Sequence, residues 1–385
     1  MRSSSYSTDR FNVLIVGGGV AALEAALALR DLSDERFATT MIAPGREFVY
    51  RPMSVRAPFG YVGARAYPLE EIARDIGVEL RADSFKWLDA KGRIVHTEAG
   101  EELSYDALLL APGARMHARF KHVTTIDDKR LDELLHGLIQ DVEGGYVHRL
   151  GFILPEQMGW PLPIYELALM TASRAYDMNI ELSITIATPE DAPLAIFGPG
   201  ASDAIRQLLE VNGILTITSA HCEVPGPGRV AVSPGSRQLH FDRIVAMPEL
   251  FGPSVPGVPL GSPGGFIPID SQCRVRGLER VYAAGDATDF AIKHGGIAAQ
   301  QADVAAQSIA AIAGLAAEPP PFRPVIHGML LTGGKPQYLS AHVTGAHGSS
   351  SQITDSPTWS PPTKIAARHL APYLEERARV VSGTP

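Results

Sequence analysis

Three short apolar runs, each ending in a glycine-containing turn, constrain the fold of this chain more than any other feature. The runs cover residues 11–16, 108–110 and 281–284, and the turns that follow contain Gly17, Gly113 and Gly285. Apolar runs without alternation are typical of parallel strands that are buried on both faces. Glycine at the end of such a strand lets the backbone approach a ligand closely. We therefore expect an α/β fold in which the three turns surround one site.

The first turn has the spacing G-x-G-x-x-A, which is typical of a dinucleotide-binding strand and helix. Gly17 permits the tight turn, Gly19 lets the backbone meet a pyrophosphate, and Ala22 keeps the next helix close to the strand. The helix is predicted over residues 20–30, with its positive end toward the phosphates. The same spacing also occurs as plain structure, so alone it does not decide the matter. The predicted contacts are Gly17, Gly18, Gly19, Val20, Ala21 and Ala22.

One element of the motif is missing. An acidic residue at the end of the second strand normally holds a ribose hydroxyl. Here the strand predicted over residues 39–42 ends in Ala43 and Pro44, whose side chains accept no hydrogen bond. Glu47 either substitutes for the missing acid or is a solvated charge. The adenosine half of the site is therefore less well defined than the phosphate half.

The order and spacing of the three turns resemble those of the pyridine nucleotide-disulfide oxidoreductase superfamily, flavoproteins with two dinucleotide-binding domains. The resemblance is greatest to sulfide:quinone oxidoreductases and type II NADH dehydrogenases. Ala111, Pro112 and Gly113 are similar to the alanine-threonine-glycine turn of that family, with proline in place of threonine. Gly285 and Asp286 are similar to its glycine-aspartate box. The resemblance implies FAD as cofactor, with Gly285 at the pyrophosphate and Asp286 at the ribityl chain.

The resemblance also implies an α/β fold with two Rossmann-like dinucleotide-binding domains and a small C-terminal region. We place the FAD-binding domain at residues 1–118 and 251–317, and an inserted NAD(P)-binding-like domain at residues 119–250. Residues 318–385 form the C-terminal region. In that region we predict a stiff linker at 318–321, a strand over 325–331, a mobile polar loop over 344–362 and a helix over 364–379. This region is expected to form a dimer contact or a lid over the flavin, or to line a quinone entrance.

A helix after the third turn is expected to point its positive end at the flavin. It is predicted over residues 297–312, where Gly296 and Ile297 would approach the ring. Lys293 either assists by stabilising negative charge on the reduced flavin or faces solvent. His294 is expected to be structural or exposed rather than a proton shuttle. Gln300 and Gln301 are ordinary helix surface unless one of them turns toward the flavin.

Two further segments are implied to lie near FAD. In the resembling quinone reductases, a proline-containing segment after the second strand passes the isoalloxazine, which places Arg51 and Pro52 beside it with Tyr50 near by. The alternative is a packed loop. Strands near 84–89 and 93–97 are expected to cap the domain, with Phe85 touching the adenine.

Composition narrows the partners and the location. The 385 residues carry a net charge of −8 without a basic run, which argues against nucleic acid and anionic membrane surfaces. Residues 1–10 are polar, so we predict no secretory signal. No stretch approaches the ~18 apolar residues of a membrane helix. We expect a cytoplasmic protein and leave peripheral membrane contact and homo-oligomer formation open.

The two cysteines exclude some chemistry. The disulfide reductases of the superfamily carry a cysteine pair soon after the first helix, and residues 47–60 contain none. Cys222 and Cys273 do not match the two cysteines that flank the flavin in sulfide:quinone oxidoreductases. We interpret both as free structural thiols. No metal site and no catalytic residue are assigned.

The inserted domain lacks a good nicotinamide loop. Its first strand and helix are predicted over residues 150–154 and 164–176, and a second strand and helix over 180–187 and 202–212. Between the first pair stands a proline-rich loop, residues 155–163, instead of G-x-G-x-x-G. Proline removes backbone donors that would cradle a pyrophosphate. Trp160 is expected to plug the domain interface and Glu190 to be a surface charge. NAD(P)H use stays open.

Three functions remain. The first is an FAD-dependent oxidoreductase that passes electrons from a small donor to a quinone or another small acceptor. The second is an NAD(P)H-dependent reductase of a ferredoxin or disulfide partner, against which the glycine-poor loop and the missing cysteine pair argue. The third is a non-enzymatic flavin-binding sensor or interaction protein.

Overall fold

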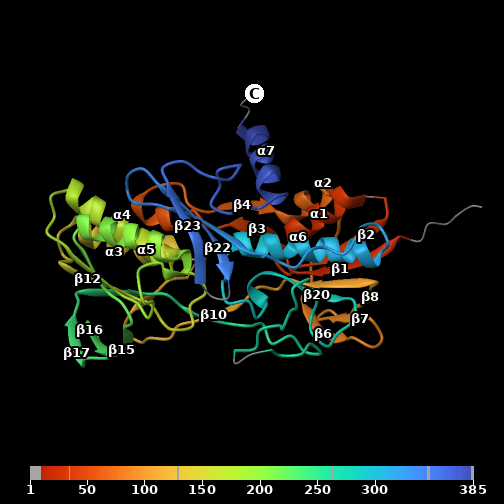
Figure 1. The fold of residues 1–385 in the computed structure, drawn as a ribbon, viewed down its shortest axis with the longest axis horizontal. Coiled ribbons are helices and arrows are strands. Elements are labelled where there is room, and N and C mark those ends of the chain that lie inside the picture. The colour runs from red at the N-terminus through yellow and green to blue at the C-terminus, as the bar shows by residue number, and fades with distance from the viewer. Residues whose placement is uncertain (1–9, 34, 128–129, 262–263, 345–346, 383–385) are drawn as a thin grey trace, which may run out of the picture.

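The computed structural model describes residues 10–382 except 34, 128–129, 262–263 and 345–346. Two α/β lobes lie along the long axis of the molecule, and the C-terminal helix α7 (Leu370–Ser382) projects from one side (Figure 1). This is the predicted fold class. The prediction that residues 1–10 are not a secretory signal falls on residues that lie, except residue 10, outside the described part of the chain. None of the described helices is long and apolar enough to cross a membrane.

The first lobe contains a five-stranded parallel sheet with the order β20-β9-β1-β2-β5. The chain passes from β1 outward to β2 and β5 and then returns to β9 on the other side of β1. The order of the strands therefore reverses between β1 and β9, which is where open α/β sheets bind ligands. The strands are β1 (Phe11–Val16), β2 (Phe37–Ile42), β5 (Glu79–Arg81), β9 (Ala107–Leu110) and β20 (Val281–Ala283).

Two alanine-rich helices, α1 (Val20–Ser33) and α6 (Gly295–Ile312), pack against each other on this sheet. Their small side chains are almost completely buried, which lets the two helices approach closely. The predicted helices are therefore confirmed, and α1 extends three residues beyond the predicted Arg30.

Small elements complete the first lobe. The predicted capping strands are present as β6 (Phe85–Asp89) and β7 (Ile94–Thr97), joined by β8 (Glu102–Ser104). A hairpin of β3 (Glu47–Tyr50) and β4 (Arg65–Pro68) encloses a 3-10 helix, η1 (Ser54–Phe59), and precedes α2 (Leu69–Asp75).

The second lobe repeats the parallel architecture with the strand order β11-β18-β12-β13-β14. Its sequence order reverses between β12 and β18. The strands are β11 (Thr124–Thr125), β12 (Arg149–Ile153), β13 (Ser183–Ala187), β14 (Ile214–Ile217) and β18 (Arg243–Ala246). The helices are α3 (Leu131–Glu143), α4 (Leu162–Asp177) and α5 (Pro199–Val211), with a short η2 (Ala195–Phe197).

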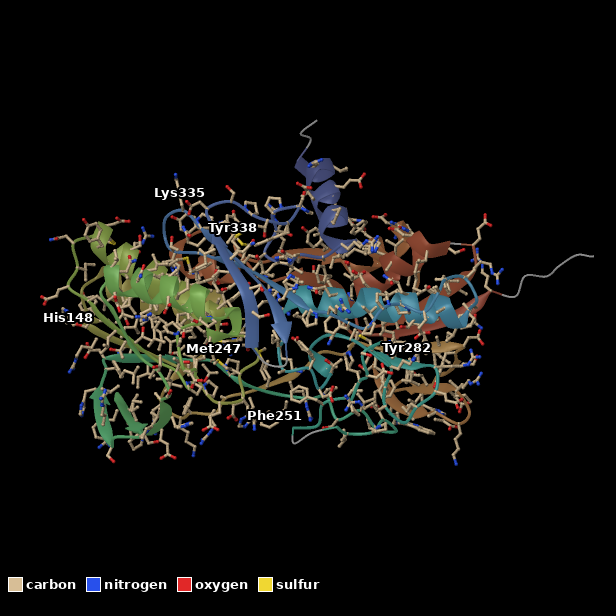
Figure 2. All side chains as sticks on the ribbon, viewed as in Figure 1. His148, Met247, Phe251, Tyr282, Lys335 and Tyr338 are labelled. Carbon is tan, nitrogen blue, oxygen red and sulfur yellow. The ribbon has the colours of Figure 1, made fainter. Side chains whose placement is uncertain are left out.

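An antiparallel meander that we did not predict packs under this sheet: β15 (His221–Gly226), β16 (Arg229–Ser233) and β17 (Arg237–His240). The two connections between the lobes pair with each other as β10 (Arg115–His117) and β19 (Glu249–Phe251). Met247 and Phe251 mark the second connection near the middle of the molecule (Figure 2).

The C-terminal region forms a sheet and a helix. The sheet consists of β21 (Val325–Leu330), β22 (Gln337–Thr344) and β23 (His347–Thr354). The prediction of a mobile loop over residues 344–362 was therefore wrong where β23 lies. β22 pairs with β23, and this pairing holds the serine-rich β23 in place. Helix α7 covers Leu370–Ser382 and not 364–379, because Pro372 fits the first turn of a helix but not its middle.

Candidate functional site

The three glycine turns converge at the carboxyl ends of the central strands of the first sheet. The backbone N–H of Ala111 donates to the carbonyl of Val16 at 2.8 Å, and that of Ala284 donates to the carbonyl of Leu110 at 3.1 Å. Each turn therefore follows a strand that is fixed to its neighbour up to its last residue. The crevice lies at the point where the strand order reverses.

Gly17 is the residue on which this convergence depends. Its φ is +125°, and a Cβ added there would lie 2.2 Å from the carbonyl oxygen of Ala111. No residue with a side chain fits a contact that short. The first turn thus needs glycine both for its conformation and for its approach to the second turn.

The start of α1 faces the crevice. Gly18, Gly19 and Val20 line the cavity there, so the free N–H groups and the positive end of the helix point into it. Ala21 and Ala22 are buried in the core beneath and let the helix lie close to the sheet. These positions suit an anionic group such as a pyrophosphate.

The third turn presents Asp286 to the same cavity. A Cβ on Gly285, whose φ is +79°, would lie 3.3 Å from the Cβ of Ala21, so this turn rests directly on the start of α1. The buried Gln301 accepts a hydrogen bond from the Gly285 N–H at 2.8 Å. Gln301 is therefore an anchor of the turn rather than helix surface, a role that its pattern in the sequence did not reveal.

Lys293 does not face solvent. Its side chain is buried, lies 4.0 Å from the centre of the Phe266 ring, and donates to the carbonyl of Thr288. Burial lowers its pKa to about 8, against the opposing effect of Asp286. The cavity wall thus carries an ammonium group that loses its proton just above neutral pH.

His294 is structural. It is half-buried, and its Nδ1 accepts the N–H of Gly296 at 3.2 Å, which caps α6. Burial lowers its pKa to about 3, so the ring is neutral. Gly295 lines the cavity at this helix start, whereas Gly296 lies behind it and the Ile297 side chain belongs to the core of the second lobe.

The cavity has a volume of about 460 Å³, and residues of the first lobe, the second lobe and the C-terminal region line it. Arg51 and Pro52 line it after β3, and their contact with the isoalloxazine stays a prediction. The predicted residues that the structure brings to its wall are Gly18, Gly19, Val20, Arg51, Pro52, Asp286 and Lys293. Phe85, Ala111, Pro112 and Gly113 lie outside this wall, and their contacts to FAD stay predictions.

A buried ion pair on the opposite wall was missed by the sequence analysis. Lys364 Nζ lies 2.5 and 2.7 Å from the two carboxylate oxygens of Glu166, and both residues line the cavity. The N–H of Leu331 donates to the same carboxylate at 3.0 Å. Burial raises the pKa of Glu166 and lowers that of Lys364, which makes proton exchange between the two groups easier.

The proline-rich loop of the second lobe closes against the first lobe. The N–H of Lys293 donates to the carbonyl of Gly159 at 3.0 Å, and a Cβ on Gly159 would lie 2.2 Å from Lys293 Cγ. The Trp160 ring lies 4.2 Å from the His294 ring and 5.6 Å from that of Phe197. Trp160 therefore plugs the interface, as predicted.

Glu190 is not a surface charge, contrary to our prediction. Its carboxylate accepts hydrogen bonds from the Tyr165 hydroxyl at 2.7 Å and from the Thr188 hydroxyl at 3.0 Å. Burial raises its pKa to about 7. The residue that stands where a ribose-binding acid would be expected is thus bound to its own domain.

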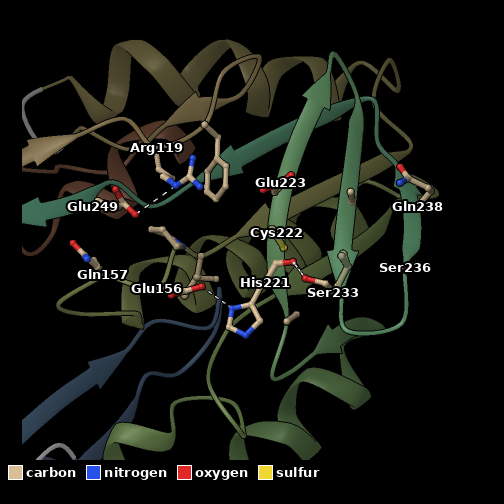
Figure 3. A pocket seen from close by; sticks show the side chains of 16 residues that line it. Arg119, Glu156, Gln157, His221, Cys222, Glu223, Ser233, Ser236, Gln238 and Glu249 are labelled. Carbon is tan, nitrogen blue, oxygen red and sulfur yellow. Dashed lines mark hydrogen bonds and ion pairs between the residues drawn. The ribbon is translucent and has the colours of Figure 1, made fainter.

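A second cavity, of about 420 Å³, lies between the end of β12 and the β15–β17 meander (Figure 3). Arg119 pairs with Glu249 at 3.7 Å, and His221 pairs with Glu156 at 2.8 Å. Glu223 lines the same cavity, so carboxylates outnumber guanidinium groups. This balance does not suit a pyrophosphate.

Both cysteines are free and buried, as expected for structural thiols. Burial raises the pKa of the Cys222 thiol to about 11 and also raises that of Cys273. Cys222 lines the second cavity, and neither cysteine lines the first.

Comparisons with known proteins agree with this geometry. Residues 11–134, which contain the first two turns, match the family described as pyridine nucleotide-disulphide oxidoreductase. The fold is similar to that of the sulfide:quinone oxidoreductase of Aquifex aeolicus, with a TM-score of 0.77 and 17% identity over 90% of this chain and 87% of that one.

Two other solved structures are similar in fold. A ferredoxin reductase from Rhodopseudomonas palustris has a TM-score of 0.64 and 20% identity over 87% of this chain and 83% of that one. A NAD-dependent persulfide reductase from A. fulgidus has a TM-score of 0.60 and 18% identity over 87% of this chain and 64% of that one.

Proposed function

We propose that this chain, whose residues 11–134 match the pyridine nucleotide-disulphide oxidoreductase family, passes electrons from a small donor to a quinone or a similar small acceptor. The chain is an FAD-dependent oxidoreductase. FAD, when bound, supplies the electron-transfer chemistry, and the protein binds, orients and tunes it. The crevice fits this cofactor because the start of α1 would face its pyrophosphate and the Asp286 carboxylate would accept a hydrogen bond from a hydroxyl group.

The observation that carries the proposal is the packing of the proline-rich loop, residues 155–163, against the first lobe. Gly159 and Trp160 pack directly on Lys293 and His294, so the protein itself fills the passage from the second lobe to the first. A nicotinamide reaching the crevice from the second domain would have to displace these contacts. The engaged Glu190 and the acidic second cavity support the same conclusion. We therefore propose a donor other than NAD(P)H.

The neighbourhood of Tyr50 supports a flat apolar acceptor. Tyr50 lines the main cavity and also a third cavity of about 320 Å³. Met53, Tyr67 and Leu374 give that cavity a mostly apolar wall. The two cavities thus offer a quinone-like ring a place next to the crevice.

The acceptor class also needs protons, because a quinone takes up two protons together with two electrons. The Glu166 and Lys364 pair is buried in the cavity wall and joined by short hydrogen bonds. We assign this pair to hold a proton beside the acceptor. The sulfide route is disfavoured because both thiols are away from the main cavity and burial raises their pKa values.

An anaerobic titration tests the proposal. FAD-loaded protein is mixed in turn with NADH, NADPH, sulfide and a reduced quinone, and the flavin absorbance is followed. We expect the reduced quinone to bleach the flavin, because electron transfer between the two is reversible, and the two nicotinamides to leave it oxidised.

Other results would point elsewhere. Rapid bleaching by a nicotinamide would favour the NAD(P)H-dependent reductase and overturn our interpretation of the proline-rich loop. Bleaching by sulfide that is lost in Cys222→Ser or Cys273→Ser would show that a thiol takes part. If no donor reduces the flavin, the non-enzymatic alternative replaces our proposal.

A further inference from the structure

Helix α7 is fixed at its first turn by a buried glutamate of another helix. Glu24, on α1, is completely inaccessible to solvent. Its Oε1 accepts the backbone N–H of His369 at 2.9 Å, and its Oε2 accepts that of Leu370 at 2.6 Å. Free N–H groups at a helix start bind a carboxylate well. Glu24 thus joins α7 to the core of the FAD domain.

A second carboxyl group lies beside the first. Asp303, on α6, places an oxygen within 4.8 Å of both a Glu24 oxygen and a His369 ring nitrogen. Its Oδ1 is buried and receives no hydrogen bond from a described residue. His369 Nε2 lies 3.6 Å from this oxygen, while its Nδ1 lies 2.8 Å from Asp31. Two carboxyl groups at this separation in a buried site cannot both be ionised without strong repulsion.

We propose that Glu24 and Asp303 share one proton and that this proton acts as a latch, which holds α7 against the FAD domain and weakens its docking when it is lost. The geometry gives the latch a direct target, since the Glu24 carboxylate that holds the first turn of α7 is the same one that Asp303 would repel. His369 and Asp31 also line a surface groove, so the site can exchange protons with water.

The latch controls a defined surface. Ala371, Leu374 and Ala378 of α7 line the third cavity together with Tyr50. Loosening α7 would therefore open this cavity beside the flavin site. The latch itself stands on the contacts of α7 alone and does not rest on the proposed acceptor.

The direction of the pH effect follows from the groups around Asp303. Burial and the Glu24 carboxylate raise the pKa of Asp303 to about 8, and Arg368 opposes this only in part. Burial also raises the pKa of Glu24. A carboxyl group with a raised pKa in the docked state stabilises docking at low pH, and this stabilisation is lost as pH rises toward about 8. Above that value the docked and undocked states bind equal numbers of protons, so the effect levels off.

Two other charged groups face the site. Arg368 lowers the pKa of Asp303 through its positive charge, and His369 bonds to Asp31 of α1. Both groups are the same in the wild type and in Asp303→Asn, so comparing the two proteins isolates the contribution of Asp303. Farther along α7, Arg377 bonds to Asp75 and Glu71 of α2 and holds the middle of the helix independently.

Hydrogen exchange of the backbone amides of α7 tests the latch. Protection factors, corrected for intrinsic exchange, are measured from about pH 5.5 to about 9.5 on the FAD-loaded wild type and on Asp303→Asn. A single linked proton lowers protection by up to about tenfold per pH unit until about pH 8. We expect this decline in the wild type. Asp303→Asn, which keeps the size but removes the charge, is expected to show constant and higher protection at pH 8.

Controls separate the latch from general effects. Glu210→Gln removes an exposed carboxylate on α5 and is expected to keep the wild-type decline, while α5 itself serves as the reference helix. If Asp303→Asn does not fold, Glu24→Gln removes the same repulsion, keeps one carbonyl acceptor and is expected to give a flat profile. Equal slopes in the wild type and in the folded variant would overturn the proposal. So would a wild-type decline that disappears with a chelator, because the three residues would then hold a cation rather than a proton.

Discussion

Gly17 is the residue whose replacement should be felt most. Its Cβ would meet the carbonyl of Ala111 at 2.2 Å, so alanine would push the ends of β1 and β9 apart where the cofactor is expected. We predict that Gly17→Ala loses bound FAD and lowers the free energy of unfolding by ~3 kcal/mol or more. The visible absorbance of the purified protein and denaturant unfolding measure the two effects.

Gly100 offers a matched control. It has a φ of +91°, but no atom lies within 4 Å of an added Cβ. Gly100→Ala should cost only the ~1–2 kcal/mol of a left-handed alanine and keep its FAD. Equal FAD content in the two variants would show that the contact between the turns does not matter for the cofactor.

Lys293 should make the flavin respond to pH. Its pKa is lowered to about 8, so the ammonium group in the cavity wall is lost above that pH. Positive charge on Lys293 favours the reduced flavin, which carries negative charge. Because this charge is lost above pH 8, the reduction potential of the wild-type flavin should fall more steeply with pH above pH 8 than below it. The folded state binds fewer protons there than the unfolded state, so this lysine also makes stability rise from pH 8 toward its ordinary pKa of 10.5.

Spectroelectrochemical titration of the wild type and Lys293→Met measures this difference. The change of slope near pH 8 in the plot of flavin potential against pH should be absent from the variant. A change of slope of the same size in both proteins would assign it to another group. Lys335, an exposed lysine in the turn before β22, provides the control variant Lys335→Met.

At the scale of elements, the Glu166 and Lys364 pair should be the strongest polar link between α4 and the C-terminal segment. Removing one partner leaves a buried unpaired charge, so Glu166→Leu and Lys364→Met should each cost ~3–5 kcal/mol. The double variant should recover most of this loss, because it buries no charge. A double-mutant cycle by denaturant unfolding measures the coupling.

The Arg174 and Glu143 pair is the control for this cycle. It joins α4 to α3 at 2.9 Å, but both side chains are partly exposed. Its coupling should be below ~1 kcal/mol. Additive losses at Glu166 and Lys364 would mean that the two side chains do not depend on each other.

The same elements show what the sequence could and could not predict. β1 and β9 were predictable because each is a buried apolar run that ends in a glycine turn, and α1 was predictable because it begins directly after the first of these turns. β23 was missed because residues 347–354 are mostly polar, and only pairing with β22 makes them a strand. Glu166 and Lys364 are 198 positions apart, and the sequence around neither residue indicates the contact.

At the scale of the whole molecule, one crevice is built by three separate parts of the chain. The first lobe supplies the turns, the loop at Trp160 closes the side toward the second lobe, and the C-terminal sheet adds Gly328 and Met329 to the wall. The C-terminal region thus forms part of the cavity wall, and its role as a lid, a dimer contact or a quinone entrance stays a prediction. The contacts of Gly159 and Trp160 support the proposal that NAD(P)H is not the donor.

The central claim is that this second lobe keeps a dinucleotide-binding architecture but is closed to a dinucleotide. The most direct test is an anaerobic calorimetric titration of the FAD-loaded protein with NADH, with the flavin spectrum recorded in the same cell. The contacts of Gly159 and Trp160 predict no saturable heat and an unchanged flavin spectrum. Saturable binding of NADH followed by bleaching of the flavin would contradict the account.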